Sequence, residues 1–256
     1  MEYRIEEFDP KEAKENRMWL IIAPRGSGKT VLLKDLLCNL SHKVDFAIAM
    51  TATESTVQSF REFMPQSLIL NNGYDHELAQ KFLDKAKQLS KIGKKRNFCM
   101  ILDDLMCDAK IMKSEVQTCL HLNGRHYNTS LFNTTQYAMI LPPAIRSNVD
   151  YVFCLQDSVL ANRKRLHEFF FGQFGKFQEF NLVFSEVTKD YGALVLDRTQ
   201  SSGKLEDSVK FYRANIQTPK FRLGRSVYFE LDRTWREMRN EKKSEERNTI
   251  LVPAAP

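Results

Sequence analysis

Apolar runs alternate with amphipathic segments along most of this chain. Runs with the length and composition of buried strands are Met18–Ala23, Val44–Met50, Ser67–Leu70, Phe98–Leu102, Ser130–Thr135 and Tyr151–Leu155. Apolar residues recur at helical spacing over Thr30–Ser41, Ser55–Phe63, Asp75–Ile92, Ile111–Arg125, Ala161–Phe171 and Phe177–Thr188. Buried strands that alternate with helices predict an α/β fold, with a mostly parallel central sheet that is flanked by helices on both faces.

The two ends of the chain have a different pattern. Met1–Asn16 is polar and predicts an arm or an edge strand. Gly192–Leu196 and Val209–Tyr212 predict a hairpin at the end of the sheet. Glu230–Arg247 is charged and predicts a helix, and the residues from 248 to 256 are expected to be disordered.

The segment Ala23-Pro-Arg-Gly-Ser-Gly-Lys-Thr30 follows the first apolar run directly and has the pattern of a phosphate-binding loop. Gly26 and Gly28 lack a Cβ, so the backbone can curl and aim its N–H groups at phosphate oxygens. Lys29 would place its charge on the terminal phosphates of ATP, and the Thr30 hydroxyl can ligate Mg²⁺. Ala23 stands where the motif usually has its first glycine. The residues expected to contact the nucleotide are Pro24, Arg25, Gly26, Ser27, Gly28, Lys29, Thr30 and Val31.

Two acids, Asp103 and Asp104, end the apolar run that begins at Phe98. Parallel sheets place their ligands at the carboxyl ends of their strands. There Asp103 would hold Mg²⁺, usually through water, because this cation prefers oxygen ligands. Asp104 can polarise a water molecule for attack on the γ-phosphate. Many ATPases have Glu at this second position, so the shorter Asp requires the water to lie closer or the backbone to advance.

The spacing between the phosphate loop and Asp103 leaves room for at least one strand–helix unit. This spacing favours the RecA-like class of P-loop NTPases over simple kinases, although it does not decide the order of the strands in the sheet. We therefore expect a RecA-like ATPase domain over residues 1–216 and a basic, charged C-terminal extension over residues 217–256.

Positive charge is unevenly distributed along the chain, which has a net charge of +6. The segment from Lys81 to Arg96 has seven basic residues and one acidic residue, and the segment from Lys204 to Arg247 has twelve and eight. A polyanion such as nucleic acid would suit this excess, because each neutralised phosphate releases counterions. Solvated helix faces are the alternative explanation.

Composition limits the class of protein further. A chain of 256 residues that is 43% hydrophobic can form one large core. No apolar run approaches the ~18–20 residues of a membrane span, and the first residues do not have the pattern of a signal peptide. The five cysteines have no metal-ligand spacing and are expected to be reduced thiols in a cytosolic protein.

Three further segments resemble a known family when they are taken as an ordered set: His121-Leu-Asn-Gly-Arg-His-Tyr-Asn-Thr-Ser130, Thr134-Thr-Gln-Tyr137 and Leu141-Pro-Pro-Ala-Ile-Arg-Ser-Asn-Val-Asp-Tyr151. They resemble the genome-packaging ATPases of nucleocytoplasmic large DNA viruses, the poxvirus-type branch of the FtsK–HerA superfamily. The resemblance runs from about Trp19 to Leu155, and more weakly to Leu231. It implies a RecA-like fold and Mg²⁺-dependent ATP hydrolysis. It also implies a ring-shaped homo-oligomer, of five or six subunits, that moves double-stranded DNA into a capsid.

The resemblance implies roles for three more residues. Gln136 is similar to the family's polar sensor, which contacts both the γ-phosphate and the attacking water. Arg125 is similar to an arginine finger that reaches the ATP of the neighbouring subunit, and Arg146 is the rival candidate for this role. The expected place of action is the viral assembly site in the host cytoplasm or the virion, where capsid or inner-membrane vertex components would be partners.

Two other functions fit a phosphate-binding loop. A nucleotide or small-molecule kinase would bind ATP in the same way, but an arginine-rich lid is not evident and Asp104 has no role in such an enzyme. A DNA-binding scaffold that is gated by ATP without hydrolysing it would suit a protein that lacks the water-activating acid or the sensor. Asp104 and Gln136 are candidates for both of these groups.

Overall fold

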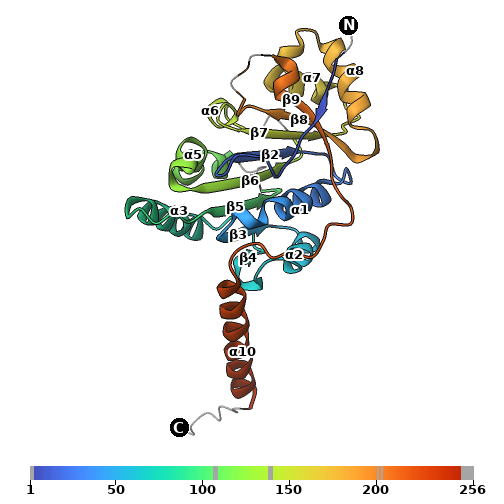
Figure 1. Cartoon of the computed structure of the whole chain (residues 1–256). Helices are drawn as coiled ribbons and strands as arrows, with labels where there is room; N and C mark the ends of the chain where they lie inside the picture. The colour runs from blue at the N-terminus through green and yellow to red at the C-terminus, as the bar shows by residue number, and fades with distance from the viewer. Residues whose placement is uncertain (1–2, 106–108, 138–140, 201, 203, 249–256) are drawn as a thin grey trace.

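The computed structural model describes residues 3–105, 109–137, 141–200, 202 and 204–248, with backbone only from 241 to 248. Its centre is a nine-stranded sheet in the order β1-β9-β8-β7-β2-β6-β5-β3-β4 (Figure 1). Neighbouring strands pair in parallel, except that β8 runs antiparallel to β7 and β9. The expected α/β fold with a mostly parallel sheet is therefore confirmed.

The strands of the sheet are short and mostly buried. Their bounds are β1 Glu6–Glu7, β2 Met18–Ile22, β3 Phe46–Thr51, β4 Ile69–Leu70, β5 Phe98–Asp103, β6 Thr129–Thr135, β7 Tyr151–Leu155, β8 Gly192–Asp197 and β9 Val209–Arg213. The helices are α1 Lys29–Leu40, α2 Glu54–Arg61, α3 His76–Lys91, α4 Ala109–Met112, α5 Glu115–Asn123, α6 Pro143–Arg146, α7 Leu160–Phe169, α8 Phe177–Val187, α9 Leu205–Ser208 and α10 Ser226–Asn248. No helix in the described ranges is long and apolar enough to cross a membrane.

Alternate residues of the central strands pack against helices on the two faces of the sheet. Trp19 and Ile21 of β2 face the core that α1 and α2 complete, whereas Leu20 and Ile22 face the core of α6, α7 and α8. A third cluster, beneath α3 and α5, contains Met18. The ring of Trp19 stacks on Phe132 of β6 at a centroid distance of 5.0 Å. Burial on both faces explains why these strands are continuous apolar runs rather than alternating ones.

The order of the strands brings together the three segments that follow β2, β5 and β6. β6 lies between β2, which precedes the phosphate loop, and β5, which ends in the acids. Ile22 is paired with Thr135, and Leu102 with Asn133. The residues that follow β2, β5 and β6 therefore meet at their carboxyl ends. The spacing between the phosphate loop and Asp103 did not decide the order of the strands, and the structure places β6 between β2 and β5.

Four expectations from the sequence need correction. The single helix expected from Ile111 to Arg125 is broken, because the side chain of Ser114 accepts a hydrogen bond from the Gln117 N–H and starts α5 anew. The expected strand at Ser67–Leu70 is reduced to Ile69–Leu70, after a 3₁₀ turn over Gln66–Leu68. The sequence also predicts that the Thr- and Ser-rich residues after Met50 cap the helix near Ser55–Phe63, but the side chain of Thr53, the residue before α2, makes no capping hydrogen bond.

The hairpin is the fourth correction. β8 and β9 pair antiparallel, as expected, but they do not end the sheet, because β1 pairs with β9 and forms the edge. The segment Met1–Asn16 was expected to form an arm or an edge strand, and it contains the short edge strand β1. Lys210 of β9 also forms an ion pair with Glu6 of β1 at 3.0 Å.

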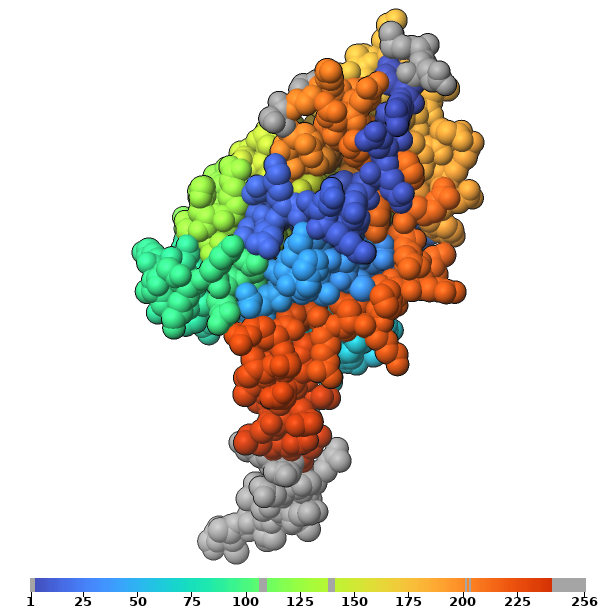
Figure 2. Space-filling view, in the orientation of Figure 1, coloured from blue at the N-terminus to red at the C-terminus, as the bar shows by residue number. Residues whose placement is uncertain are grey.

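The C-terminal segment packs against the body of the protein before α10 projects away from it (Figures 1 and 2). The N–H of Leu223 donates to the Phe63 carbonyl at 2.8 Å, and Phe221 stacks on the Phe63 ring at 4.6 Å. Tyr228, in the first turn of α10, contacts Phe46 edge to face at 4.8 Å. The domain boundary between residues 216 and 217 stays a prediction, and the expected disorder from 249 to 256 lies outside the described residues.

The thiols also agree in part with the expectation. Cys38, Cys99, Cys119 and Cys154 are free cysteines, and Cys107 lies outside the described residues. Cys99 and Cys154 are fully buried in strands, and this burial raises the pKa of both thiols. A buried thiol of this kind packs as a small apolar side chain.

Candidate nucleotide-hydrolysis site

The phosphate loop between β2 and α1 has the backbone that its glycines allow. Gly26 and Gly28 have φ angles of 75° and 93°, in the left-handed region, and Gly28 is the N-cap of α1. The Ser27 hydroxyl donates to the Pro24 carbonyl at 2.6 Å and closes the loop. Ala23 is fully buried and its N–H donates to the Thr135 carbonyl at 2.9 Å, so this residue continues the β2–β6 ladder. At the position where the motif usually has its first glycine, the Ala23 methyl group is therefore part of the core.

Lys29, Asp104 and Gln136 converge at the carboxyl edge of the sheet. The Nζ of Lys29 lies 3.1 Å from Oδ1 of Asp104. The side-chain amide of Gln136 donates to Oδ2 of the same carboxylate at 2.9 Å. The side chains of Lys29 and Asp104 are 13% and 28% exposed, so the three groups are shielded but accessible. A cation, an acid and an amide thus share one site, although they come from three different segments.

The backbone at Asp104 turns sharply at the end of β5. Its φ angle is 57°, in a region that few residues other than glycine adopt. The Asp104 N–H donates to Oγ1 of Thr134 at 3.0 Å, and that hydroxyl donates to Oδ1 of Asp103 at 2.7 Å. The turn directs the two consecutive acids to different partners. Asp103 remains with the sheet, and Asp104 turns toward Lys29.

Asp103 is a buried carboxylate, 2% exposed, surrounded by threonine hydroxyls. Its Oδ2 accepts from Oγ1 of Thr56 at 2.9 Å, and Oγ1 of Thr51 lies 3.5 Å from the same oxygen. Hydrogen bonds to a charged group are stronger than those between neutral groups, and they offset part of the cost of burying the charge. They also fix the orientation of the carboxylate.

The residues around Asp103 suit Mg²⁺. The donors are carboxylate and hydroxyl oxygens, which this cation prefers, and Thr30 lies in the first turn of α1. Within the described parts of the chain, no group of three or more His, Cys, Asp or Glu side chains could hold a metal ion.

Sequence reasoning missed the threonines that hold Asp103. Thr56 was expected only as part of the helix near Ser55–Phe63, and Thr134 only as part of the strand Ser130–Thr135 and of a family segment. Both are at least 95% buried although they are polar. A polar residue at the carboxyl end of an apolar strand is the signal that could have identified Thr134 and Thr51. Thr56 has no such signal, because its contact depends on how α2 packs.

Arg125 lies near the amino-terminal ends of the central strands, whereas the phosphate loop lies at their carboxyl ends. It is exposed and lines a cavity of about 200 Å³ together with Met18, at the start of β2, and Asp150, which precedes β7. The five residues of β2 span roughly 16 Å, so this arginine is remote from Lys29 of its own chain. Burial raises the pKa of Asp150, and the nearby charges of Arg17 and Arg125 oppose that shift.

Arg146, the other candidate for the arginine finger, contacts residues of its own chain. Its guanidinium lies 3.8 Å from the centre of the Phe169 ring, and burial lowers its pKa. Its carbonyl accepts a hydrogen bond from the guanidinium of Arg198 at 2.7 Å. Arg25, in the phosphate loop, is exposed, and Val31 is 39% exposed in the first turn of α1.

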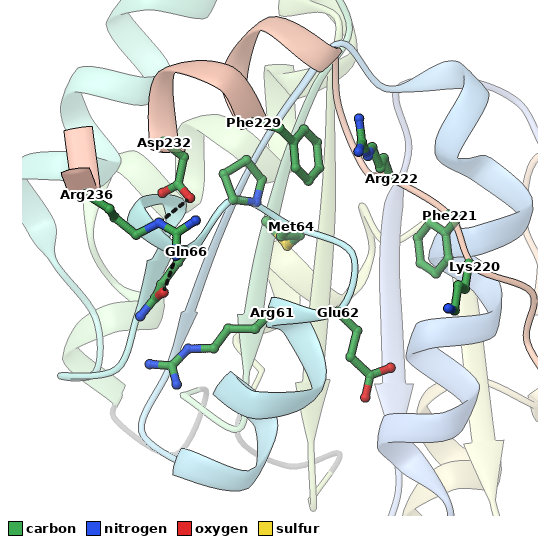
Figure 3. A pocket seen from close by; sticks show the side chains of 11 residues that line it. Arg61, Glu62, Met64, Gln66, Lys220, Phe221, Arg222, Phe229, Asp232 and Arg236 are labelled. Carbon is green, nitrogen blue, oxygen red and sulfur yellow. Dashed lines mark hydrogen bonds and ion pairs between the residues drawn. The ribbon is translucent and has the colours of Figure 1, made fainter. Parts of the chain in front are cut away.

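A groove of about 940 Å³ lies at the far end of α2 from Asp103 (Figure 3). Arg61, the last residue of α2, and Glu62, which follows it, form one wall. Lys220, Arg222 and Arg236 of the C-terminal segment contribute basic side chains. Both acids of the groove are already paired. Glu62 binds Lys34, and Asp232 binds Arg236 at 3.0 Å. Arg61 also forms an ion pair, with Glu54 at 3.9 Å, so Lys220 and Arg222 contribute most of the positive charge of the groove.

Comparisons with known proteins agree with this fold. The genome packaging NTPase B204 of Sulfolobus turreted icosahedral virus 2, solved with AMP, has a TM-score of 0.57 and 14% identity. The match covers 80% of this chain and 99% of that one. The cytoplasmic domain of the type VII secretion ATPase EccC from Thermomonospora curvata has a TM-score of 0.54 and 14% identity, over 85% of this chain and 28% of that one. At such low identity these matches establish a shared P-loop ATPase fold.

Sequence comparison is more specific. The chain is 33% identical to protein 088R of Invertebrate iridescent virus 3 over 211 residues, 81% of this chain and 80% of that protein. It is 30% identical to protein 075L of Invertebrate iridescent virus 6 over 241 residues, which cover 90% and 93% of the two chains. The profile of the family described as poxvirus A32 protein matches residues 6–166. This match confirms the resemblance to the poxvirus-type packaging ATPases, and the chain belongs to the poxvirus A32 protein family.

Proposed function

We propose that this protein is a Mg²⁺-dependent ATPase motor that moves double-stranded viral DNA into the capsid during genome packaging. It would act as a ring of five or six copies at the viral assembly site in the host cytoplasm, or in the virion. Capsid or inner-membrane vertex components would be its further partners. Family membership supports a packaging ATPase, and the site supports hydrolysis of ATP by water.

The convergence of Lys29, Asp104 and Gln136 carries this proposal. Lys29 neutralises charge on the terminal phosphates. The carboxylate of Asp104 accepts the proton of the attacking water, and the amide of Gln136 orients that water against the γ-phosphate. A kinase transfers the phosphoryl group to a substrate rather than to water, and has no need of this acid.

Thr30 and Asp103 are the residues that would hold Mg²⁺. When bound, the ion neutralises charge on the phosphate oxygens as the terminal phosphate leaves. The chain's own contribution is to orient the Asp103 carboxylate, through Thr56 and Thr134. The buried hydroxyls leave this carboxylate little freedom to rotate.

The groove at the end of α2 is the surface we assign to duplex DNA (Figure 3). Arg61, Lys220 and Arg222 place positive charge along it, as a phosphate backbone requires. α2 carries Thr56 near its start and Arg61 at its end. One short helix therefore joins the contact to Asp103 with the proposed contact to DNA, and this gives ATP turnover a direct route to the DNA-binding surface.

Measurement of phosphate release, with and without duplex DNA, tests the enzymatic proposal. We expect Mg²⁺-dependent hydrolysis without any phosphoryl acceptor, and a higher rate when duplex DNA is added. Lys29→Ala, which removes the phosphate-neutralising charge, should abolish the activity. Transfer of phosphate only to an added acceptor would identify a kinase. ATP binding without turnover, with or without DNA, would identify a gated scaffold.

Two matched pairs of substitutions test the groove. Lys220→Ala with Arg222→Ala should weaken binding to duplex DNA and reduce the slope of log Kd against log salt by about 1–2. Lys91→Ala with Lys94→Ala removes the same charge from the basic segment near the end of α3 and serves as the control. If only the α3 pair weakens binding, the DNA surface lies on α3 and the groove has another role.

A further inference from the structure

We infer that Tyr191 forms a stacking surface for the purine base of the nucleotide, beside the phosphate loop. This inference rests on the proposed binding of ATP and adds a contact to the base. The Tyr191 side chain is 64% exposed, so its ring is accessible to a ligand. A Cβ built on Gly28 would lie only 3.1 Å from Cδ1 of Tyr191. The ring therefore lies against the phosphate loop itself.

The direction of β8 brings Tyr191 to this place. Tyr191 immediately precedes Gly192, the first residue of β8. Because β8 runs antiparallel to β7, its first residue lies where the neighbouring parallel strands end. Gly192 and Arg213 are paired at that edge. The turn before β8 thus reaches the edge of the sheet that carries the phosphate loop, although about 160 residues separate the two segments in the sequence.

The backbone of this turn is strained and fixed. Asp190 and Tyr191 are consecutive residues with φ angles of 50° and 61°, in the left-handed region that non-glycine residues avoid. A Cβ at position 192 would lie 2.1 Å from the Val187 carbonyl oxygen, so only glycine fits there. The guanidinium of Arg213 donates to the Lys189 carbonyl at 3.3 Å and holds the turn from β9.

Strained, over-determined turns of this kind commonly present a side chain to a ligand. Here the presented group is an exposed aromatic ring, and the neighbouring ligand site is the one that would hold phosphates. A nucleotide with its phosphates in the loop has its base a short distance away. Purine rings stack well on tyrosine, and Val31, 39% exposed in the first turn of α1, offers a second apolar surface nearby.

The test compares ATP with inorganic tripolyphosphate, which has the same phosphate chain but no base. Affinities would be measured by calorimetry on the full-length protein and on Tyr191→Ala, Tyr191→Leu and Tyr191→Phe variants. We expect Tyr191→Ala to weaken ATP binding by about 5- to 150-fold, the range typical of aromatic–base stacking. Tripolyphosphate binding should stay within twofold of that of the unmodified protein. Tyr191→Phe should retain the affinity for ATP.

The leucine variant separates stacking from structural support. Leucine keeps an apolar contact on Gly28 without an aromatic face, so it should bind tripolyphosphate normally and ATP weakly. Equal losses for ATP and tripolyphosphate would overturn the inference, because Tyr191 would then only support the loop. ATP that binds no more tightly than tripolyphosphate to the unmodified protein would overturn the base site and leave the phosphate site intact. If neither ligand binds, the proposed function fails together with the base site.

Discussion

The Nζ of Lys29 and Oδ1 of Asp104 lie 3.1 Å apart, although one residue begins α1 and the other follows β5. β6 lies between the two strands that position them, and Gln136, which follows β6, donates to the other oxygen of Asp104. The carboxylate therefore has a charged partner on one oxygen and a neutral donor on the other. This arrangement defines which residue of the acid pair can face the terminal phosphate.

Asp104→Asn should stop hydrolysis while ATP binding is retained. The amide is nearly the same size as the carboxylate, but it cannot accept the proton of the attacking water. Loss of a general base typically lowers the rate by ~10²–10⁴-fold. Single-turnover phosphate release would give the rate, and calorimetry would give the affinity for ATP. A variant that hydrolyses ATP at the original rate would show that another acid activates the water.

Thr56→Val should lower hydrolysis by about 10- to 100-fold, the range typical of groups that orient a metal ligand. Valine has the shape of threonine but cannot donate to Oδ2 of Asp103, which Thr56 reaches at 2.9 Å. The Mg²⁺ concentration that gives half-maximal activity should rise as well. Ser55→Ala, on the exposed side of the same helix, is the control. If Thr56→Val and Ser55→Ala hydrolyse ATP at the same rate, Thr56 does not orient Asp103 for hydrolysis.

Arg125→Ala tests whether an arginine acts between subunits. Because Arg125 lies at the edge of the sheet away from its own phosphate loop, its loss should leave ATP affinity of the isolated subunit unchanged. The activity of the assembled ring should fall by ~10³–10⁵-fold, the usual contribution of an arginine finger. ATP hydrolysis by rings of verified size would be measured for this variant and for Arg146→Ala.

Mixed rings provide a sharper form of the same experiment. An Asp104→Asn subunit still has Arg125 and can supply it to an Arg125→Ala neighbour, whose own phosphate loop and acids are intact. Rings that contain both variants should therefore recover activity that neither variant has alone. Recovery with Arg146→Ala in place of Arg125→Ala, and none with Arg125→Ala, would assign the finger to Arg146.

His121 should make the folded protein less stable in mild acid. It is fully buried, and burial lowers its pKa from 6.5 to about 4. Its Nδ1–H donates to the Gln117 carbonyl, and its Nε2 accepts from the Asn133 amide, so the neutral ring fits both partners. The unfolded chain binds a proton that the folded chain does not between pH 6.5 and 4. The neutral His121 ring therefore makes its full contribution to the stability of the folded protein above pH 6.5, and this contribution is lost as the pH falls toward 4.

Urea unfolding at a series of pH values measures this effect. One proton taken up on unfolding gives a slope of about 1.4 kcal/mol per pH unit. His121→Gln keeps hydrogen-bonding capacity but does not titrate, so it should reduce the slope between pH 6.5 and 4 relative to the original protein. An unchanged slope would mean that other groups account for the acid sensitivity.

The sequence by itself determined the features that are local. The phosphate loop, the acid pair after β5 and the periodicity of α1 and α3 each depend on a short run of residues, whose composition restricts the backbone directly. The family could be inferred in the same way, because its segments are contiguous. Element boundaries were less certain, and the break at Ser114 shows why: a single capping side chain can divide a continuous amphipathic pattern.

Tertiary structure alone decided which segments meet. The insertion of β6 between β2 and β5 brings Gln136 to Asp104, and the packing of α2 brings Thr56 to Asp103. The reversed direction of β8 carries Tyr191 to the phosphate loop. No local pattern encodes these contacts, because the order and direction of strands follow from which buried faces pack together across the whole sheet. The same packing places Arg125 beside Met18, at the start of β2, away from the phosphate loop of its own chain.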